Sequence, residues 1–194
     1  EKAVSGQALT LSALSDEFRR GGINFGLTAV HTNLLRKGVD HMLALATENM
    51  NKAYTAIRKR DVAMLEEIAE TEEAIDILNK DIAKYISKIL VHNNSGQNVS
   101  DIERYFLIAG NTERIGDHAI NIAGYTKLLK EKSIEFSGLA CDEIEKMQAI
   151  TAEALKQALN VEDDTAAWLK KVESLEEQID NMTTEYRETH LARM

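Results

Sequence analysis

The chain has 194 residues, of which 44% are hydrophobic and 28% are charged, so it is long enough and apolar enough to bury a sizeable core. Its formal net charge of −9 at pH 7 argues against a nucleic-acid-binding protein, which needs a basic face. Cys141 is the only cysteine, which excludes a disulfide framework and a zinc–thiolate cluster and fits a reducing compartment. The sequence contains no proline, and nothing therefore forces a break in a long helix. The composition predicts an all-α protein.

Apolar residues at helical spacing predict a short N-terminal segment followed by five long helices. The short segment covers about residues 8–20 and ends at Gly21 and Gly22. The long helices are expected at about residues 24–59, 61–90, 100–131, 139–160 and 163–190. Asp61 is the predicted N-cap of the second of these helices, and Ser100 or Asp101 that of the third. Short loops between long helices favour antiparallel, up-down bundles.

Parts of the sequence are repeated. The stretch LEEIAETEEAID, which ends at Asp76, aligns with LKKVESLEEQID, which ends at Asp180. Upstream, MLALATENMNKA from Met42 aligns with MQAITAEALKQA from Met147. The helix expected at about 100–131 has no copy. We therefore expect an N-terminal extension (1–22), a complete three-helix repeat (23–133) and a partial second repeat of two helices (134–194).

The third helix of the second repeat is thus missing, and two explanations stay open. The helix could belong to a longer protein, which the start at Glu1 rather than at methionine suggests. It could also come from a second copy of the chain in a homo-oligomer.

Three pairs of carboxylates with the spacing E-x-x-x-D each share one helical stripe: Glu72 and Asp76, Glu113 and Asp117, Glu176 and Asp180. Two such stripes on neighbouring helices would bring four carboxylates together, and their mutual repulsion would favour a bound cation. Carboxylate oxygens suit hard ions such as Mg²⁺, Ca²⁺, Mn²⁺ or ferric iron. The sequence therefore predicts a metal site on these six residues.

The alternative is that the acidic pairs are ordinary solvated faces, which is the more frequent explanation for any single pair. Three further acidic pairs have the same spacing: Glu66/Glu70, Glu131/Glu135 and Glu173/Glu177. What favours Glu113 and Asp117 is the seam of small residues beside them, formed by Ala109, Thr112, Gly116, Ala119 and Ala123. A neighbouring helix can approach such a seam closely, with Gly116 clearing room next to the acidic stripe.

The sequence gives little support to an enzyme. None of the five histidines has a glutamate three positions before it, which argues against the ferritin type of di-iron bundle. The chain contains no nucleophile–base set and no glycine-rich phosphate loop. A metal-dependent hydrolase or oxidase is therefore the least favoured reading, and we predict that the chain is not an enzyme.

TERIGDHAINIA, residues 112–123, resembles the third-helix signature of the PhoU family of phosphate-uptake regulators. EEAID and EEQID resemble the acidic motif that this family carries on the second helix of each repeat. The resemblance implies two pseudo-symmetric three-helix bundles. It also implies that the acidic motifs hold iron or zinc clusters, as in some members, or magnesium or manganese, as in others. Carried over to this chain, the metal ligands are Glu72, Asp76, Glu113, Asp117, Glu176 and Asp180.

The function implied is that of a metal-binding regulatory domain in phosphate uptake. The stretch before the first bundle helix makes the chain similar to the cytosolic PhoU-like tail of sodium/phosphate cotransporters. That reading predicts a soluble domain on the cytoplasmic side of the inner membrane, with the transporter's membrane domain as its partner. The alternatives are a stand-alone PhoU-type regulator of an ABC phosphate transporter and a purely structural helical oligomerisation scaffold.

Overall fold

The computed structural model describes residues 13–19, 28–92, 99–160 and 164–193. These residues form long α-helices, joined in one place by a short 3₁₀ turn. The bounds are α2 (Thr28–Lys59), η1 (Val62–Met64), α3 (Leu65–His92), α4 (Val99–Glu131), α5 (Gly138–Leu159) and α6 (Thr165–Arg193). A short helical segment at residues 13–19 precedes them. The expected all-α fold with long helices is confirmed.

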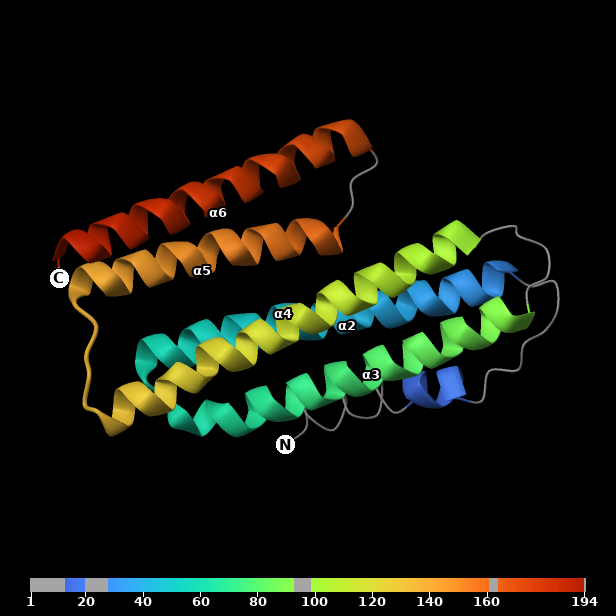
Figure 1. The fold of residues 1–194 in the computed structure, drawn as a ribbon, viewed down its shortest axis with the longest axis horizontal. Helices are drawn as coiled ribbons and strands as arrows, with labels where there is room; N and C mark the ends of the chain where they lie inside the picture. The colour runs from blue at the N-terminus through green and yellow to red at the C-terminus, as the bar shows by residue number, and fades with distance from the viewer. Residues whose placement is uncertain (1–12, 20–27, 93–98, 161–163, 194) are drawn as a thin grey trace.

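The helices α2, α3 and α4 form a three-helix bundle in which each contacts the other two (Figure 1). Successive helices run in opposite directions, as the short connections predict. The bundle is held together by apolar side chains that recur once per turn, among them Leu35, Met42 and Ile75, all completely buried. Burial of these stripes is what stabilises helices of this length, because propensity alone contributes little.

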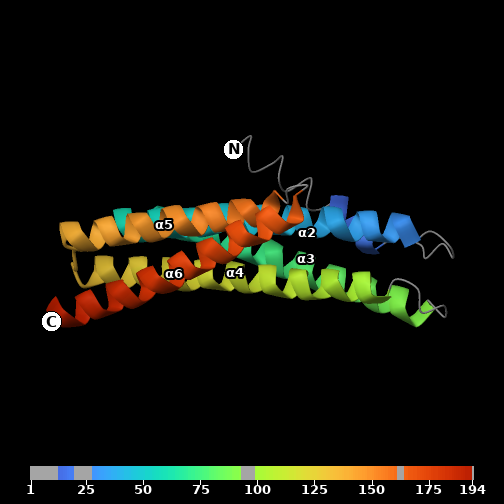
Figure 2. The ribbon, with the colours of Figure 1, turned by 90° about the horizontal axis from the view of Figure 1, so that it is seen from above.

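The α5–α6 hairpin lies on one side of this bundle. Only α5 of the two makes extensive contact with it, running along α2, while α6 packs on α5 (Figure 2). At the junction the guanidinium of Arg58 lies 2.7 Å from the carboxylate of Glu145. The hairpin buries few side chains completely: Gln157 on α5 and Leu175 on α6. The hairpin is thus an appendage of the bundle and contributes little to its core.

The helix ends show where cap chemistry predicted the boundaries and where it did not. Asp61 is an N-cap, since its carboxylate accepts a hydrogen bond of 3.0 Å from the amide of Ala63. It caps the turn η1, which leads directly into α3. The prediction for α4 was wrong: the helix begins at Val99, so Ser100 and Asp101 lie inside its first turn. An acidic residue there is favourable because it faces the positive end of the helix dipole.

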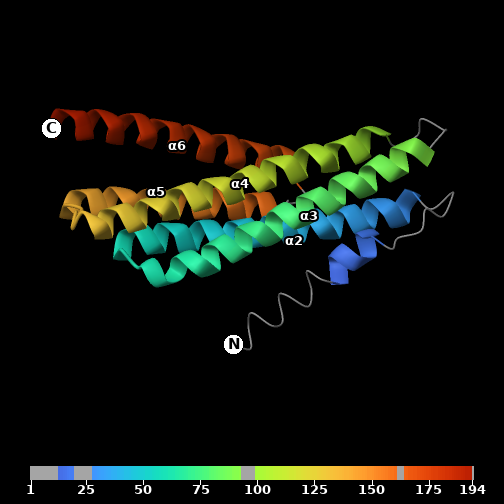
Figure 3. The ribbon, with the colours of Figure 1, turned by 60° about the horizontal axis from the view of Figure 1, so that its bottom comes forward.

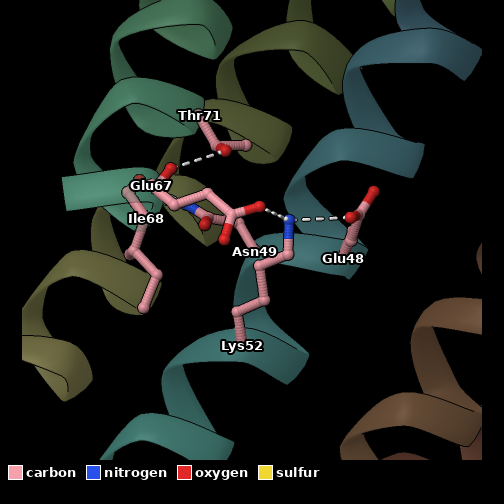
Figure 4. Close-up of polar contacts among 6 residues, drawn as sticks. All are labelled: Glu48, Asn49, Lys52, Glu67, Ile68 and Thr71. Atoms are coloured by element: carbon pink, nitrogen blue, oxygen red, sulfur yellow. Dashed lines mark hydrogen bonds and ion pairs between the residues drawn. The ribbon is translucent and has the colours of Figure 1, made fainter. Parts of the chain in front are cut away.

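Polar contacts fix α3 against α2 (Figure 4). The side-chain amide of the fully buried Asn49 donates a 3.0 Å hydrogen bond to the carbonyl of Ile68. One turn further along α2, Lys52 lies between two carboxylates, 2.7 Å from Glu48 and 2.8 Å from Glu67. Burial alone would lower the pKa of Lys52, but its hydrogen bonds to the two glutamates outweigh that effect and raise it.

Residues 13–19 lie on the side of the bundle opposite to α6, as the two views show (Figures 1 and 3). They fall within the predicted N-terminal extension (1–22). Gly21 and Gly22, predicted to separate that extension from the bundle, lie outside the described residues. In the part of the chain that the structure describes, no helix is long and apolar enough to cross a membrane.

Candidate metal centre

The small-residue seam of α4 is the surface on which this helix packs. The structure buries all five of its members: Ala109, Thr112, Gly116, Ala119 and Ala123. Small side chains let the backbones of two helices come close, so the residues flanking the seam are carried toward the neighbouring helix. Glu113 and Asp117 flank it, with Glu113 half-buried and Asp117 exposed.

Gly116 faces α3 at the turn that carries Glu72. A Cβ atom placed on Gly116 would lie 3.4 Å from Cδ1 of Ile75 and 3.8 Å from Cγ of Glu72. There is therefore room for a methyl group in ordinary van der Waals contact, and for nothing larger. The middle of the acidic stripe thus faces Ile75 and Glu72 at a place where only a small residue fits.

The charges of three other carboxylates act on Glu72 at this contact. Burial raises the pKa of Glu72 above its ordinary value, and the charges of Asp117, Asp76 and Glu113 raise it further. Two of these three residues belong to α4 and one to α3, so the stripes of both helices act on the same side chain. We call Glu72, Asp76, Glu113 and Asp117 the acidic cluster. The other three members oppose the ionisation of Glu72, which is an energetic cost that a cation would relieve.

A lysine supplies part of the missing positive charge. Lys80, one turn after Asp76 on α3, forms an ion pair with the Asp76 carboxylate. The hydrogen bond to Asp76 and the charges of Asp76, Glu72 and Glu113 together raise the pKa of Lys80. Lys80 therefore stays protonated at neutral pH and acts as a counter-ion of the acidic cluster. It was not predicted, although its spacing of four residues from Asp76 is visible in the sequence.

The chemistry of the cluster suits a hard cation, but the side chains do not form a finished coordination shell. Oxygen donors alone are what Mg²⁺, Mn²⁺ or Ca²⁺ prefer. Within the ranges that the structure describes, however, no group of three or more His, Cys, Asp or Glu side chains is arranged to hold a metal ion. Asp76 is turned toward Lys80 instead. Coordination would require Asp76 to leave Lys80 and the other carboxylates to move closer together.

The remaining predicted ligands, Glu176 and Asp180, lie apart from this cluster. Both are exposed on α6, whose neighbour is α5 and not α4. In the sequence repeat, Glu176 and Asp180 of α6 align with Glu72 and Asp76 of α3. Among the described helices there is no counterpart of α4 beside them. Their role as metal ligands stays a prediction.

His118 adds no ligand to the cluster. It follows Asp117 directly but is exposed on α4, where successive side chains point in directions about 100° apart.

Comparison with known proteins supports the resemblance read from the motifs. The PhoU domain family matches residues 39–126. One relative is the phosphate-specific transport system accessory protein PhoU homolog 1 of Thermotoga maritima. It is 28% identical over 137 residues, which are 68% of this chain and 57% of that protein. A PhoU homolog of Aquifex aeolicus is 32% identical over 98 residues, 50% of this chain and 44% of its own length.

The chain thus spans about half the length of the curated relatives it matches. No solved structure matches it significantly. The matched range begins within α2 and ends near the end of α4, so it contains every residue of the acidic cluster. Residues 39–126 of this chain are therefore a PhoU domain.

Proposed function

We propose that this chain is a metal-binding regulatory domain of phosphate uptake. Two observations support the proposal. The curated relatives are named accessory proteins of phosphate-specific transport systems. The matched domain also contains an acidic cluster whose carboxylates repel one another. A regulatory role needs no catalytic residues, and the sequence offers none beside the carboxylates.

The metal site is proposed at the acidic cluster, with Glu72 and Asp76 from α3 and Glu113 and Asp117 from α4 as ligands. The observation that carries this assignment is the contact between Gly116 of α4 and Glu72 of α3, where burial raises the pKa of Glu72 and three carboxylates from the two helices raise it further. A bound cation would add to the positive charge that Lys80 supplies. It would tie α3 to α4 and stabilise the bundle by linkage. Mg²⁺ and Mn²⁺ suit this oxygen-only donor set better than zinc does.

The proposed partner is a phosphate transporter. In one version the chain is the soluble domain of a sodium-dependent phosphate transporter and acts at the cytoplasmic side of the inner membrane. In the other it is a separate accessory protein of an ABC phosphate transporter, as the names of the relatives suggest. The reading frame of the full gene distinguishes the two versions, because only the first predicts membrane-spanning segments in the same polypeptide.

The metal proposal is tested by equilibrium dialysis against Mn²⁺, followed by elemental analysis. We expect saturable binding to the wild-type chain and its loss in Asp117→Asn, which keeps the size of the side chain and removes its charge. Glu70→Gln is the matched control, because Glu70 is an exposed carboxylate of α3 outside the acidic cluster. Absence of saturable binding to the wild type would favour the scaffold alternative, in which the acidic stripes only keep the bundle soluble.

A further inference from the structure

The segment at residues 13–19 is anchored by an aromatic side chain that enters a notch in α2. Phe18 is 1% exposed and contacts Tyr85 edge to face, with the ring centroids 5.3 Å apart. The floor of the notch is Gly38. A Cβ atom there would lie 2.6 Å from Cζ of Phe18, closer than a real Cβ can approach, so the ring occupies space that only a glycine leaves. The notch and the ring are complementary in shape.

The same segment satisfies a buried carboxylate on α3. Asp81 is only 4% exposed. It accepts a hydrogen bond from the hydroxyl of Ser15, and Nε and Nη2 of Arg19 each lie 3.1 Å from its Oδ2. Among the described residues, all hydrogen bonds and ion pairs to the Asp81 side chain come from this segment. The notch on α2 and the buried carboxylate on α3 define one groove between these helices. Both are contacted by side chains of the same helical segment.

The three contacting side chains have a simple spacing. Ser15, Phe18 and Arg19 stand at positions i, i+3 and i+4, which place them on one face of a helix. The opposite face, with Ala13 and Glu17, is exposed. We propose that the groove between α2 and α3 is a recognition site for a short helix with this pattern, and that residues 13–19 of the same chain are its reversible occupant.

Reversibility follows from how little holds the segment. One large side chain, Phe18, is fully buried, and the guanidinium side chain of Arg19 is 59% exposed. By contrast, α3 buries a stripe of isoleucines along its length, among them Ile68, Ile75 and Ile82. The segment can thus open while α3 stays folded.

The first test measures opening in the unmodified chain by amide hydrogen exchange. We expect the amides of residues 15–19 to exchange at least about 10-fold faster than the buried amides of α3. Their exchange rate is proportional to the fraction of molecules in which the segment has left the bundle. The rates should not depend on protein concentration, because the segment docks on its own chain. Exchange of these amides only together with α3 would overturn the proposal. So would a concentration dependence, which would assign the docking to a second copy.

The second test supplies the helix in trans. A labelled peptide with the sequence of residues 9–22 is titrated into the full chain carrying Phe18→Ala, and fluorescence anisotropy is measured. We expect saturable binding that is at least about 10-fold tighter than to the wild-type chain, whose own segment competes for the groove. Adding Gly38→Leu to the Phe18→Ala chain should abolish binding, and so should Phe18→Ala in the peptide.

Lys84→Gln serves as the matched control, because Lys84 is exposed on α3 away from the notch. Circular dichroism establishes that each variant chain is folded. Equal affinity for the wild-type and Phe18→Ala chains, or binding that survives Gly38→Leu, would contradict a specific groove.

Discussion

Glu72 on α3 and Gly116 on α4 lie against each other: a Cβ atom on Gly116 would be 3.8 Å from Cγ of Glu72. This contact accounts for two locally unfavourable features of α4, an interior glycine and an acidic pair one turn apart. Glycine in a helix interior costs roughly 0.5–1 kcal/mol relative to alanine. An acidic pair one turn apart costs a few tenths of a kcal/mol, about 0.2–0.5. A side chain larger than a methyl group at position 116 would hold the acidic stripe of α4 away from that of α3.

The close approach of α3 and α4 at Gly116 can be tested with a bulky side chain. Gly116→Leu would force the side chain against Ile75, and such overpacking typically costs about 1–3 kcal/mol. Gly124→Leu is the matched control, because a Cβ atom at Gly124 has no neighbour within 4 Å. It should instead stabilise the chain by about 0.5–1 kcal/mol through helix propensity. Chemical denaturation measures both, and equal effects of the two substitutions would contradict the packing.

Glu72 gives the metal-free chain a pH dependence with a defined sign. Its raised pKa means that the folded chain keeps a proton on Glu72 at a pH at which the unfolded chain has lost it. The resulting stability is fully present below the ordinary glutamate pKa and is lost as the pH rises through the raised value. Glu72→Gln removes the titrating group, so its melting temperature should exceed that of the wild type increasingly as the pH rises through this window.

Glu73→Gln is the control for this titration, since Glu73 is the exposed neighbour of Glu72 and contributes least among the four carboxylates that raise the pKa of Glu72. A wild-type chain whose stability relative to Glu72→Gln rises with pH would contradict the assignment.

Lys80 should compete with a metal ion for the acidic cluster. Lys80→Gln removes the ion pair with Asp76 and leaves the four carboxylates without their counter-ion. We expect the metal-free chain to become only slightly less stable, since the pair is exposed, and its affinity for Mn²⁺ to increase. Lys84→Gln, one turn further along α3, should change neither quantity. Calorimetric titration measures the Mn²⁺ affinity of both variants. Weaker Mn²⁺ binding by Lys80→Gln than by the wild type would argue against the acidic cluster as the metal site.

Asn49 should matter for the bundle and not for the metal. Its amide donates to the carbonyl of Ile68 in a completely buried position, and removal of a buried polar partner costs about 1–3 kcal/mol. Asn49→Ala should therefore lower the free energy of unfolding by about that amount and leave the number of bound Mn²⁺ ions unchanged. Denaturation and dialysis measure the two quantities separately. A loss of metal without a loss of stability would show that Asn49 acts on the site.

The helices could be predicted from the sequence because their stripes are long and uninterrupted. Apolar residues such as Leu35, Met42 and Ile75 recur at helical spacing with no proline between them, and all three are in the core. The start of α4 was harder, since Ser100 and Asp101 are good caps and also tolerable first-turn residues. Local preference could not choose between these two positions.

The acidic cluster could be predicted only in part. The spacing of Glu113 and Asp117 and the glycine between them are properties of one helix, so a helical wheel places them correctly beside the buried seam. That Glu72 faces them depends on how α3 and α4 pack, which spacing does not fix. The burial of Asp81 was not predicted, because an aspartate in a polar stretch normally faces water. Its partners Ser15 and Arg19 lie more than sixty positions away along the chain.

The most direct test of the proposed metal site is the melting temperature with and without Mn²⁺, for the wild type, Asp117→Asn and Glu70→Gln. At an ion concentration one hundred times the dissociation constant, linkage stabilises by about 2.7 kcal/mol, or about 5–10 °C for a chain of this size. We predict that rise for the wild type and for Glu70→Gln, and none for Asp117→Asn. An unchanged wild-type melting curve, or an equal rise in Asp117→Asn, would contradict a cation held between α3 and α4.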